Sequence, residues 1–328
     1  MRAVIVDEQG APARLDEDVT EEELLDGPVE LDVLYSSYNY KDGLAITGTG
    51  RGVLQRWPII PGIDIVGTVT RSDDPAWDTG DTVVLNGDGI GETRNGGFAT
   101  RARVRGDALV ELPRQISPER AAAIGTAGFT AMLCVLQLSD AGVTPDSGDV
   151  LVTGAAGGVG SVAVSLLAGR GYRVVASTGR IEEEGDYLRG LGAAALLDRR
   201  EFSEEVGKPL QEQRWAGAVD AVGSTTLANV LAQVSYGGTV SACGLAQGMD
   251  LPTTVAPFIL RGVTLSGANS VYAPAELRRR AWAALAEELD LEVLDRMTTT
   301  ISLADTIPYA EHILDGRTRG RTVVDVNA

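Results

Sequence analysis

The stretch from Val150 to Ser161 constrains the fold more than any other part of this sequence. It reads Val-Leu-Val-Thr-Gly-Ala-Ala-Gly-Gly-Val-Gly-Ser, so an apolar run leads directly into four glycines, and a run of small apolar residues follows it. This order predicts a strand, a tight turn and a helix whose N-terminus offers backbone N–H groups to a pyrophosphate. The glycine spacing is offset from the common G-x-G-x-x-G pattern, and a glycine cluster can be a purely structural turn. The context on both sides favours dinucleotide binding.

The following predicted strand, from Arg173 to its exit at Arg180, indicates which dinucleotide binds. A site that prefers NAD usually has an acidic residue here, which bonds the ribose 2′-OH. No acidic residue occurs from 170 to 181. The nearby polar residues carry hydroxyl or guanidinium groups: Ser177, Thr178, Arg180, Arg199 and Arg200. These groups suit a 2′-phosphate and predict NADP(H), the alternative being an ordinary polar surface loop.

Composition excludes several classes of protein. A length of 328 residues predicts two domains or one large one, and a net charge of −18 argues against nucleic acid or an anionic membrane as partner. Cys134 and Cys243 lie in apolar surroundings and predict free thiols in a reducing compartment. The N-terminus does not resemble a signal peptide, and the longest apolar run, 121–136, is too short and mixed to span a bilayer. We therefore expect a cytoplasmic protein.

The two parts of the chain have different periodicity. Short apolar runs between Gly, Pro and Asp predict a β-rich region over residues 1–120, with strands at 3–6, 29–35, 63–69, 82–85, 97–104 and 108–111. A helix over 121–138 follows, and strands then alternate with helices up to about residue 267, which predicts an α/β fold with a doubly wound parallel sheet. Helices at 274–288 and 307–314 and a last strand at 321–326 are expected to pack back on the first domain.

Several kinds of catalytic site are excluded by the residues present. One histidine, His312, and two distant cysteines do not supply the usual zinc ligand sets, so no metal is expected. A Ser-His-Asp triad would need another histidine, and His312 is better explained as a surface or capping residue. Any chemistry is therefore expected to rest on the nicotinamide, oriented by the protein.

The strongest candidate outside the glycine turn is the segment from Ser36 to Asp42. It follows a predicted strand, at the start of a Gly-rich connection over 41–61, and it could also be a simple polar turn. Lys41 is one of only two lysines among the 28 basic residues, which favours a function for it. Tyr40 has a neutral phenol that can donate a hydrogen bond or a proton. The arginines at 101, 103 and 105, and those at 278–280, are expected on solvated surfaces, although the first three could grip phosphates.

Six motifs together resemble one known family: 39–42 (Asn-Tyr-Lys-Asp), 61–64 (Pro-Gly-Ile-Asp), 125–131, 153–160, 215–220 and 251–261. The chain resembles, from about residue 2 to 327, the acrylyl-CoA reductase (NADPH) branch of the zinc-free quinone oxidoreductases, in the medium-chain dehydrogenase/reductase superfamily. The superfamily resemblance is very specific. The branch is indicated by Asn-Tyr-Lys-Asp at 39–42 and Leu-Pro-Thr-Thr-Val at 251–255.

The resemblance implies a GroES-like catalytic domain over residues 1–121, completed by 270–328, and a Rossmann NADPH-binding domain over 122–269. It also implies a homodimer. The residues that it implies hold NADPH are Tyr40, Ala156, Gly157, Gly158, Val159, Thr178, Gly179, Arg180, Arg199, Leu245, Ile259 and Ser270. Asn39, Tyr40 and Lys41 are the expected catalytic residues. The acidic run at 182–184 departs from the family and would weaken phosphate binding if it pointed inward.

The activity implied by the resemblance is reduction of the C=C bond of acryloyl-CoA to propanoyl-CoA by hydride transfer to the β-carbon, without metal. Two alternatives remain open at this point. One is an NADPH-dependent quinone or general enone reductase without CoA specificity, and the other is a non-catalytic NADPH-binding protein.

Overall fold

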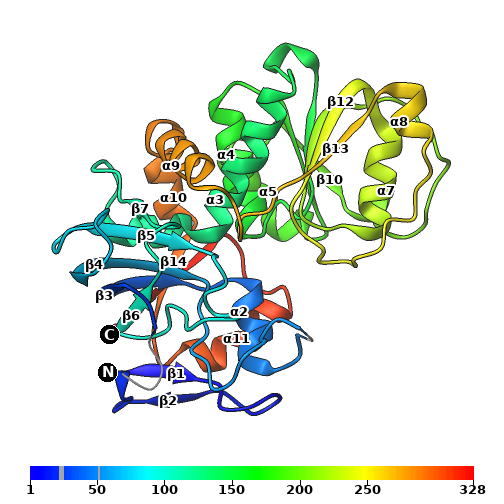
Figure 1. The fold of residues 1–328 in the computed structure, drawn as a ribbon. Helices are drawn as coiled ribbons and strands as arrows, with labels where there is room; N and C mark the ends of the chain where they lie inside the picture. The colour runs from blue at the N-terminus through cyan, green and yellow to red at the C-terminus, as the bar shows by residue number, and fades with distance from the viewer. Residues whose placement is uncertain (22–25, 51) are drawn as a thin grey trace. The chain divides into compact units, whose positions relative to one another are not determined.

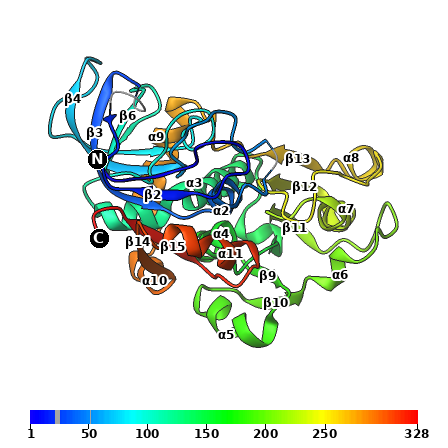
Figure 2. The same ribbon diagram turned by 90° about the horizontal axis from the view of Figure 1, so that it is seen from below.

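A computed structural model describes residues 1–21, 26–50 and 52–328. The chain forms two compact units, whose elements are labelled in Figures 1 and 2. The first consists of Met1–Phe129, Ser270–Ala286 and Leu294–Ala328, and the second of Thr130–Asn269 and Glu287–Val293. The chain thus passes out of the first unit at Phe129, within a helix.

The second unit is built on a parallel sheet. Its strands are β8 (Val150–Val152), β9 (Val174–Thr178), β10 (Ala195–Asp198), β11 (Trp215–Asp220), β12 (Val234–Ala242) and β13 (Thr264–Gly267). Among the described residues their order is β10-β9-β8-β11-β12-β13, and every neighbouring pair is parallel. The order reverses direction at β8 and β11, which confirms the predicted doubly wound sheet.

Helices cover both faces of this sheet. They are the second part of α3 (Pro118–Asp140), α4 (Gly158–Gly169), α5 (Ile181–Gly190), α6 (Arg200–Ser203), α7 (Ser224–Gln233) and α8 (Ala256–Arg261). Figure 1 shows α4 and α7 on opposite sides of the strands, as right-handed crossovers in opposite directions require. The strands β8 and β11 are buried throughout, because a parallel sheet covered on both faces has no exposed side.

The first unit contains a mainly antiparallel sheet. In the described chain its strand order is β14 (Thr298–Ser302), β15 (Arg321–Asp325), β3 (Val29–Ser37), β4 (Asp64–Ser72), β5 (Thr82–Asn86) and β7 (Val110–Glu111), while β6 (Arg101–Val104) also pairs with β3. A separate pair joins β1 (Ala3–Ile5) to β2 (Arg14–Asp16). Since β15 pairs with β3, the C-terminal segment completes this sheet, as the sequence predicted.

The helices of the first unit include one that the sequence analysis missed. Residues 41–61 were expected to form a long Gly-rich loop, whereas α2 (Tyr40–Thr47) occupies the start of that segment; Arg51 lies outside the described residues. The Asp42 carboxylate accepts a hydrogen bond from the backbone N–H of Asn39, which caps the first turn. Gly48 ends the helix with a φ of 66°.

Other elements of the C-terminal segment are α9 (Ala275–Glu288), α10 (Leu291–Arg296) and α11 (Thr306–Leu314). The strands β2 and β14 and the helix α10 were not predicted. Helix α11 packs on α2, since a Cβ on Gly43 would lie 2.7 Å from Ile313 Cγ2.

The long helix α3 carries the most apolar stretch of the chain. By length and composition it could cross a membrane, but 89% of its apolar window is buried inside the protein, as in a core helix. Its regular geometry breaks at Gly125, which has a φ of 49° and a ψ of −162°. The break starts a new half-helix at Thr126, whose backbone N–H therefore needs a partner outside the helix.

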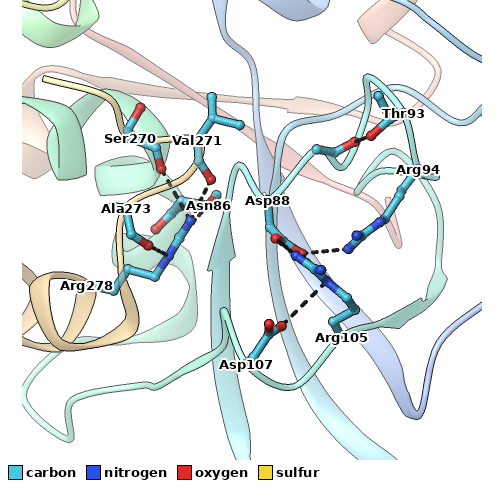
Figure 3. Close-up of polar contacts among 11 residues, drawn as sticks. Asn86, Asp88, Thr93, Arg94, Arg105, Asp107, Ser270, Val271, Ala273 and Arg278 are labelled. Carbon is cyan, nitrogen blue, oxygen red and sulfur yellow. Dashed lines mark hydrogen bonds and ion pairs between the residues drawn. The ribbon is translucent and has the colours of Figure 1, made fainter. Parts of the chain in front are cut away.

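Arg278 corrects the expectation that the arginines at 278–280 are all solvated. Its side chain is buried and donates to the carbonyl oxygens of Asn86 at 2.6 Å, Ala273 at 2.9 Å and Val271 at 2.8 Å (Figure 3). The guanidinium also lies 5.6 Å from the ring centroid of Phe129. Burial lowers the pKa of Arg278, because desolvation disfavours its charged form.

We predict that Arg278→Met destabilises the protein by about 2 kcal/mol or more, because the carbonyl groups of Asn86 and Ala273 lose a buried donor. Denaturant unfolding measures the change. The neighbouring Arg279 is exposed, so Arg279→Met is the matched control and should stay within about 0.5 kcal/mol of the parent. Equal stability of the two variants would contradict the structural role of Arg278.

Candidate functional site

The glycine turn lies at the carboxyl end of β8, as predicted. Gly154 adopts a φ of 59°, and Gly157 is the N-cap of α4. A side chain at residue 160 would collide with the carbonyl oxygen of Gly154 and would lie 2.6 Å from the Cα of Ala155. Only glycine at 160 therefore lets the turn close against the helix. The first backbone N–H groups of α4 have no intrahelical acceptor, which is the arrangement by which helix N-termini bind anions.

A buried aspartate fixes the start of the turn. Asp220, at the end of β11, accepts hydrogen bonds from Thr153 Oγ1 at 2.7 Å and from the backbone N–H of Gly223 at 2.8 Å. The Thr153 hydroxyl in turn accepts from the N–H of Ala221 at 3.1 Å. Burial raises the pKa of Asp220, since its carboxylate is removed from water. The neighbouring strand ends β8 and β11 are thus held together where the glycine turn begins.

The predicted 2′-phosphate residues meet at the carboxyl ends of the next two strands. Gly179 follows β9 and Arg199 follows β10; a Cβ on Gly179 would lie 2.6 Å from Arg199 Nε and 3.0 Å from Arg199 Cζ. The Arg199 guanidinium therefore lies directly over the backbone of Gly179. It is exposed and makes no hydrogen bond or ion pair with the described residues, so its donors are available to a ligand.

The other polar groups of this predicted set are engaged within the protein. Arg180 forms an ion pair with Glu184 at 3.3 Å, and Arg200 forms one with Asp198 at 2.6 Å. Ser177 and Thr178 are buried, and Thr178 Oγ1 accepts from the backbone N–H of Arg180 at 3.2 Å. The acidic residues 182–184 lie in the first turn of α5, where the helix dipole stabilises negative charge.

The remaining predicted cofactor residues occupy different places. Leu245 follows β12 at the same edge of the sheet as the glycine turn, and its side chain is exposed. Ile259 lies on α8, in the connection that returns the chain from β12 to β13, and is also exposed. Ser270 belongs to the first unit, where its carbonyl oxygen accepts from Arg278 Nη2 at 3.4 Å (Figure 3).

The segment of Asn39, Tyr40 and Lys41 forms the N-terminus of α2. Tyr40 is 49% exposed, and its hydroxyl makes no hydrogen bond with a described residue. Lys41 Nζ pairs with Glu92 Oε1 at 2.7 Å, which holds the ammonium in one direction. Asn39 is buried, and its amide is used inside the protein. The phenol of Tyr40 is therefore exposed and left for a ligand, and the Lys41 ammonium keeps N–H groups beyond the one that Glu92 accepts.

Two buried carboxylates, those of Asp42 and Asp64, accept hydrogen bonds from Asn39. Asp42 Oδ1 accepts from the N–H of Ile63 at 3.0 Å, and Asn39 Nδ2 donates to Asp64 Oδ2 at 2.8 Å. Burial, and then the charge of Asp64, raise the pKa of Asp42 to about 7. Asp64 was not among the predicted site residues, although an acid at the start of an apolar strand is a visible signal in the sequence.

Other candidates have structural partners. Arg101 pairs with Glu21 and Asp32, and Arg103 pairs with Glu30, so they form ion pairs on a partly exposed strand face. Arg105 lies beyond the strand, and together with Arg94 it pairs with Asp88, as Figure 3 shows. His312 is exposed in the last turn of α11. Among the described residues, no group of three or more His, Cys, Asp or Glu side chains is placed to hold a metal ion.

Comparison with known proteins assigns both units to families. Residues 26–114 match the alcohol dehydrogenase GroES-like domain, and residues 158–287 match the family described as zinc-binding dehydrogenase. The chain is 50% identical to the probable acrylyl-CoA reductase AcuI of Escherichia coli strain K12 over 100% of both chains. It is 49% identical to the acrylyl-CoA reductase AcuI of Ruegeria pomeroyi over 99% of both.

Solved structures of similar proteins have the same fold over the full length of this chain. The yhdH oxidoreductase from Salmonella enterica in complex with NADP has a TM-score of 0.96 and 50% identity, covering 100% of both chains. The yhfP protein of Bacillus subtilis with NAD bound has a TM-score of 0.94 and 42% identity, covering 99% of both. A GroES-like unit and a Rossmann unit on one chain define a medium-chain dehydrogenase/reductase fold. Within that superfamily, the chain belongs to the acrylyl-CoA reductase branch of the quinone oxidoreductases.

Proposed function

We propose that this protein is an NADPH-dependent reductase of the C=C bond of an α,β-unsaturated acyl-CoA, with acryloyl-CoA as substrate and propanoyl-CoA as product. The observation that carries the proposal is the full-length identity of 49–50% to proteins named acrylyl-CoA reductase. The glycine turn, the Arg199 guanidinium over Gly179 and the free phenol of Tyr40 support it, because they offer sites for a phosphate-bearing cofactor and a donor for a substrate.

The chain's own residues fit NADPH. We assign the pyrophosphate to Ala156, Gly157, Gly158 and Val159 at the N-terminus of α4, and the 2′-phosphate to Thr178–Arg180 with Arg199 as the free cation. Tyr40, Leu245, Ile259 and Ser270 complete the proposed set. When bound, the reduced nicotinamide supplies a hydride to the substrate. An NADP-bound and an NAD-bound relative are both known, so the preference rests here on Arg199.

The proposed mechanism uses hydrogen-bond donors of the first unit. The thioester carbonyl withdraws electrons from the C=C bond, so hydride adds at the β-carbon and negative charge develops on the carbonyl oxygen. A donor aimed at that oxygen lowers the barrier. Tyr40 can supply such an O–H group, and Lys41, oriented by Glu92, can supply an N–H group. The α-carbon then takes a proton from solvent or a side chain.

One observation favours a second candidate, an NADPH:quinone oxidoreductase. The putative quinone oxidoreductase YhfP of Bacillus subtilis is 44% identical over 93% of this chain and 92% of its own. The two candidates share fold, cofactor and hydride transfer, and they differ in the acceptor.

The purified protein, supplied with NADPH, should oxidise it rapidly with acryloyl-CoA and slowly with a simple quinone. The loss of NADPH absorbance measures both rates, and identification of propanoyl-CoA confirms the product. Turnover of the quinone alone would favour the second candidate. NADPH binding without turnover of either acceptor would indicate a non-catalytic binding protein.

In the same assay, Tyr40→Phe tests the donor. Because the variant keeps the ring and removes only the hydroxyl, we expect kcat to fall about tenfold or more with acryloyl-CoA. Unchanged turnover at saturating NADPH would remove the Tyr40 hydroxyl from the chemistry.

Arg199→Ala should weaken NADPH binding about tenfold or more and leave NADH binding nearly unchanged, since a charged hydrogen bond to phosphate contributes about 1.5–3 kcal/mol. Fluorescence titration of each nucleotide measures this. Arg200→Ala is the matched control, because the neighbouring guanidinium is already paired with Asp198. An NADPH affinity within about twofold of the parent for Arg199→Ala would contradict the assignment.

We further propose a cytoplasmic homodimer. Exposed apolar side chains gather on residues 245–260, among them Met249, Val255, Ile259 and Leu260, and the edge strand β13 pairs only with β12 in the described chain. Pairing of two β13 edges would cover both features. Light scattering should give the mass of two chains, and the mass of one chain at micromolar concentration would contradict the dimer.

A further inference from the structure

The carboxylate of Asp64 collects hydrogen bonds from four separate segments of the first unit. It is 1% exposed and stands at the first residue of β4. Its donors come from the end of β3, the N-cap of α2, the end of β5 and the half-helix that starts after the break in α3; they belong to Ser37, Asn39, Asn86 and Thr126. Both Asp64 oxygens are therefore used within the protein.

Asn39 is the donor that leads to the proposed reaction site. Its Nδ2 donates to Asp64 Oδ2 at 2.8 Å and to Asp42 Oδ2 at 3.2 Å, while its Oδ1 accepts from Arg321 Nη1 at 3.4 Å. The next two residues are Tyr40 and Lys41, in the first turn of α2. The direction in which α2 begins therefore depends on the position of the Asn39 amide.

Gly125 closes this cluster on its remaining side. A Cβ there would collide with Ser37 Oγ and would lie 2.7 Å from Arg321 Nη2 and 2.9 Å from Asp64 Oδ2. The Arg321 side chain is itself buried and donates from Nε to the carbonyl oxygen of Ala123 at 2.7 Å. The polar groups of Ser37, Arg321 and Asp64 thus pack directly against the backbone of Gly125. Because Asn39 bonds to Asp64 and Arg321, this close packing leaves its side chain little freedom to move.

We propose that Asp64 is a positioning residue for the reaction: through Asn39 its carboxylate fixes the first turn of α2, and with it the hydroxyl of Tyr40 and the ammonium of Lys41. Asp64 acts without touching substrate or cofactor. The inference rests on the proposed function for the role of Tyr40, and it assigns to Asp64 a part in that function.

The charge of Asp64 gives the proposal a specific signature. Among the described residues, the charge that acts on Asp42 is that of Asp64 from β4, and the Asp42 charge in turn raises the pKa of Tyr38, which follows β3. Arg321 from β15 contacts the same cluster through its hydrogen bond to Asn39 Oδ1. Since the Asp64 charge raises the pKa of Asp42, removal of that charge lowers it. The ionised Asp42 carboxylate accepts the N–H of Asn39, and protonation weakens this cap of α2. Activity should therefore fall at low pH as Asp42 becomes protonated.

The test compares Asp64→Asn with Tyr38→Phe. The first keeps the shape of residue 64 and removes its charge and half of its acceptors; the second removes one buried hydrogen bond, from Tyr38 Oη to the carbonyl oxygen of Thr306 at 2.9 Å, and leaves Asn39 untouched. We expect Asp64→Asn to lower kcat about tenfold or more, with KM for acryloyl-CoA within about threefold and the acidic limb shifted to lower pH. Tyr38→Phe should lower Tm but leave kcat within about twofold.

Two results would overturn the proposal. One is a kcat within about twofold of the parent for Asp64→Asn, with an unshifted pH profile. The other is an equal loss of kcat in both variants at equal loss of Tm, which would tie activity to stability alone. If Asp64→Asn does not fold, Asn39→Ala removes the side-chain hydrogen bond that joins Asp64 to the N-cap of α2 and should reproduce the loss of kcat. Full activity of that variant would equally overturn the inference.

Failure of the proposed function is distinguishable from failure of this inference. If the parent protein does not reduce acryloyl-CoA, the proposed function fails. NADPH affinity, read by fluorescence, then still reports the position of Tyr40, which we assign to the cofactor. It should weaken at least threefold in Asp64→Asn and not in Tyr38→Phe, about 0.6 kcal/mol or more, and no difference between the two would overturn the inference.

Discussion

The first unit depends on one buried interaction, the satisfaction of the Asp64 carboxylate. A charge removed from water is tolerated only where donors surround it, so the ends of β3 and β5, the N-cap of α2 and the break in α3 must all come to the same place. The second unit uses a similar device. Asp220, buried at the end of β11, binds Thr153 and the backbone beyond β11, and so fixes the start of the glycine turn. In each unit, a buried aspartate at a strand end holds the segment that we assign to the reaction.

The sequence predicted the parts of the fold that depend on neighbouring residues. The run from Val150 to Ser161 specifies strand, turn and helix within twelve positions, and Gly160 is required by an oxygen only six residues away. The lack of an acidic residue from 170 to 181, which indicated NADP(H), is likewise a feature of one short segment, β9 and the residues on either side of it. Alternation of apolar strands and helices then predicts the doubly wound sheet, because each βαβ crossover is right-handed.

What the sequence could not predict depends on contacts between distant residues. Helix α2 begins in a segment rich in glycine. The cap from Asp42 to the Asn39 N–H is local, but the contacts of Asp42 with Ile63 and with the charge of Asp64 join residues about twenty positions apart. Arg278 occurs in a helix beside two further arginines, and nothing local distinguishes the one that reaches Asn86. The pairing of Lys41 with Glu92 spans 51 positions. In each case a polar group is placed by tertiary packing, on which the local sequence pattern carries no information.

The charge of the chain bears on how it could select an anionic ligand. With a net charge of −18, long-range attraction does not draw phosphates to this protein, so recognition must come from local groups such as a helix N-terminus or an individual cation. The neighbouring arginines of the second unit are already paired, Arg180 with Glu184 and Arg200 with Asp198. Arg199 differs, because its guanidinium lies over a glycine backbone and forms no ion pair with the described residues. A single unpaired cation in acidic surroundings gains more from a phosphate than a paired one, which must first break its own bond. We therefore propose that Arg199 carries most of the discrimination between a 2′-phosphate and a 2′-hydroxyl.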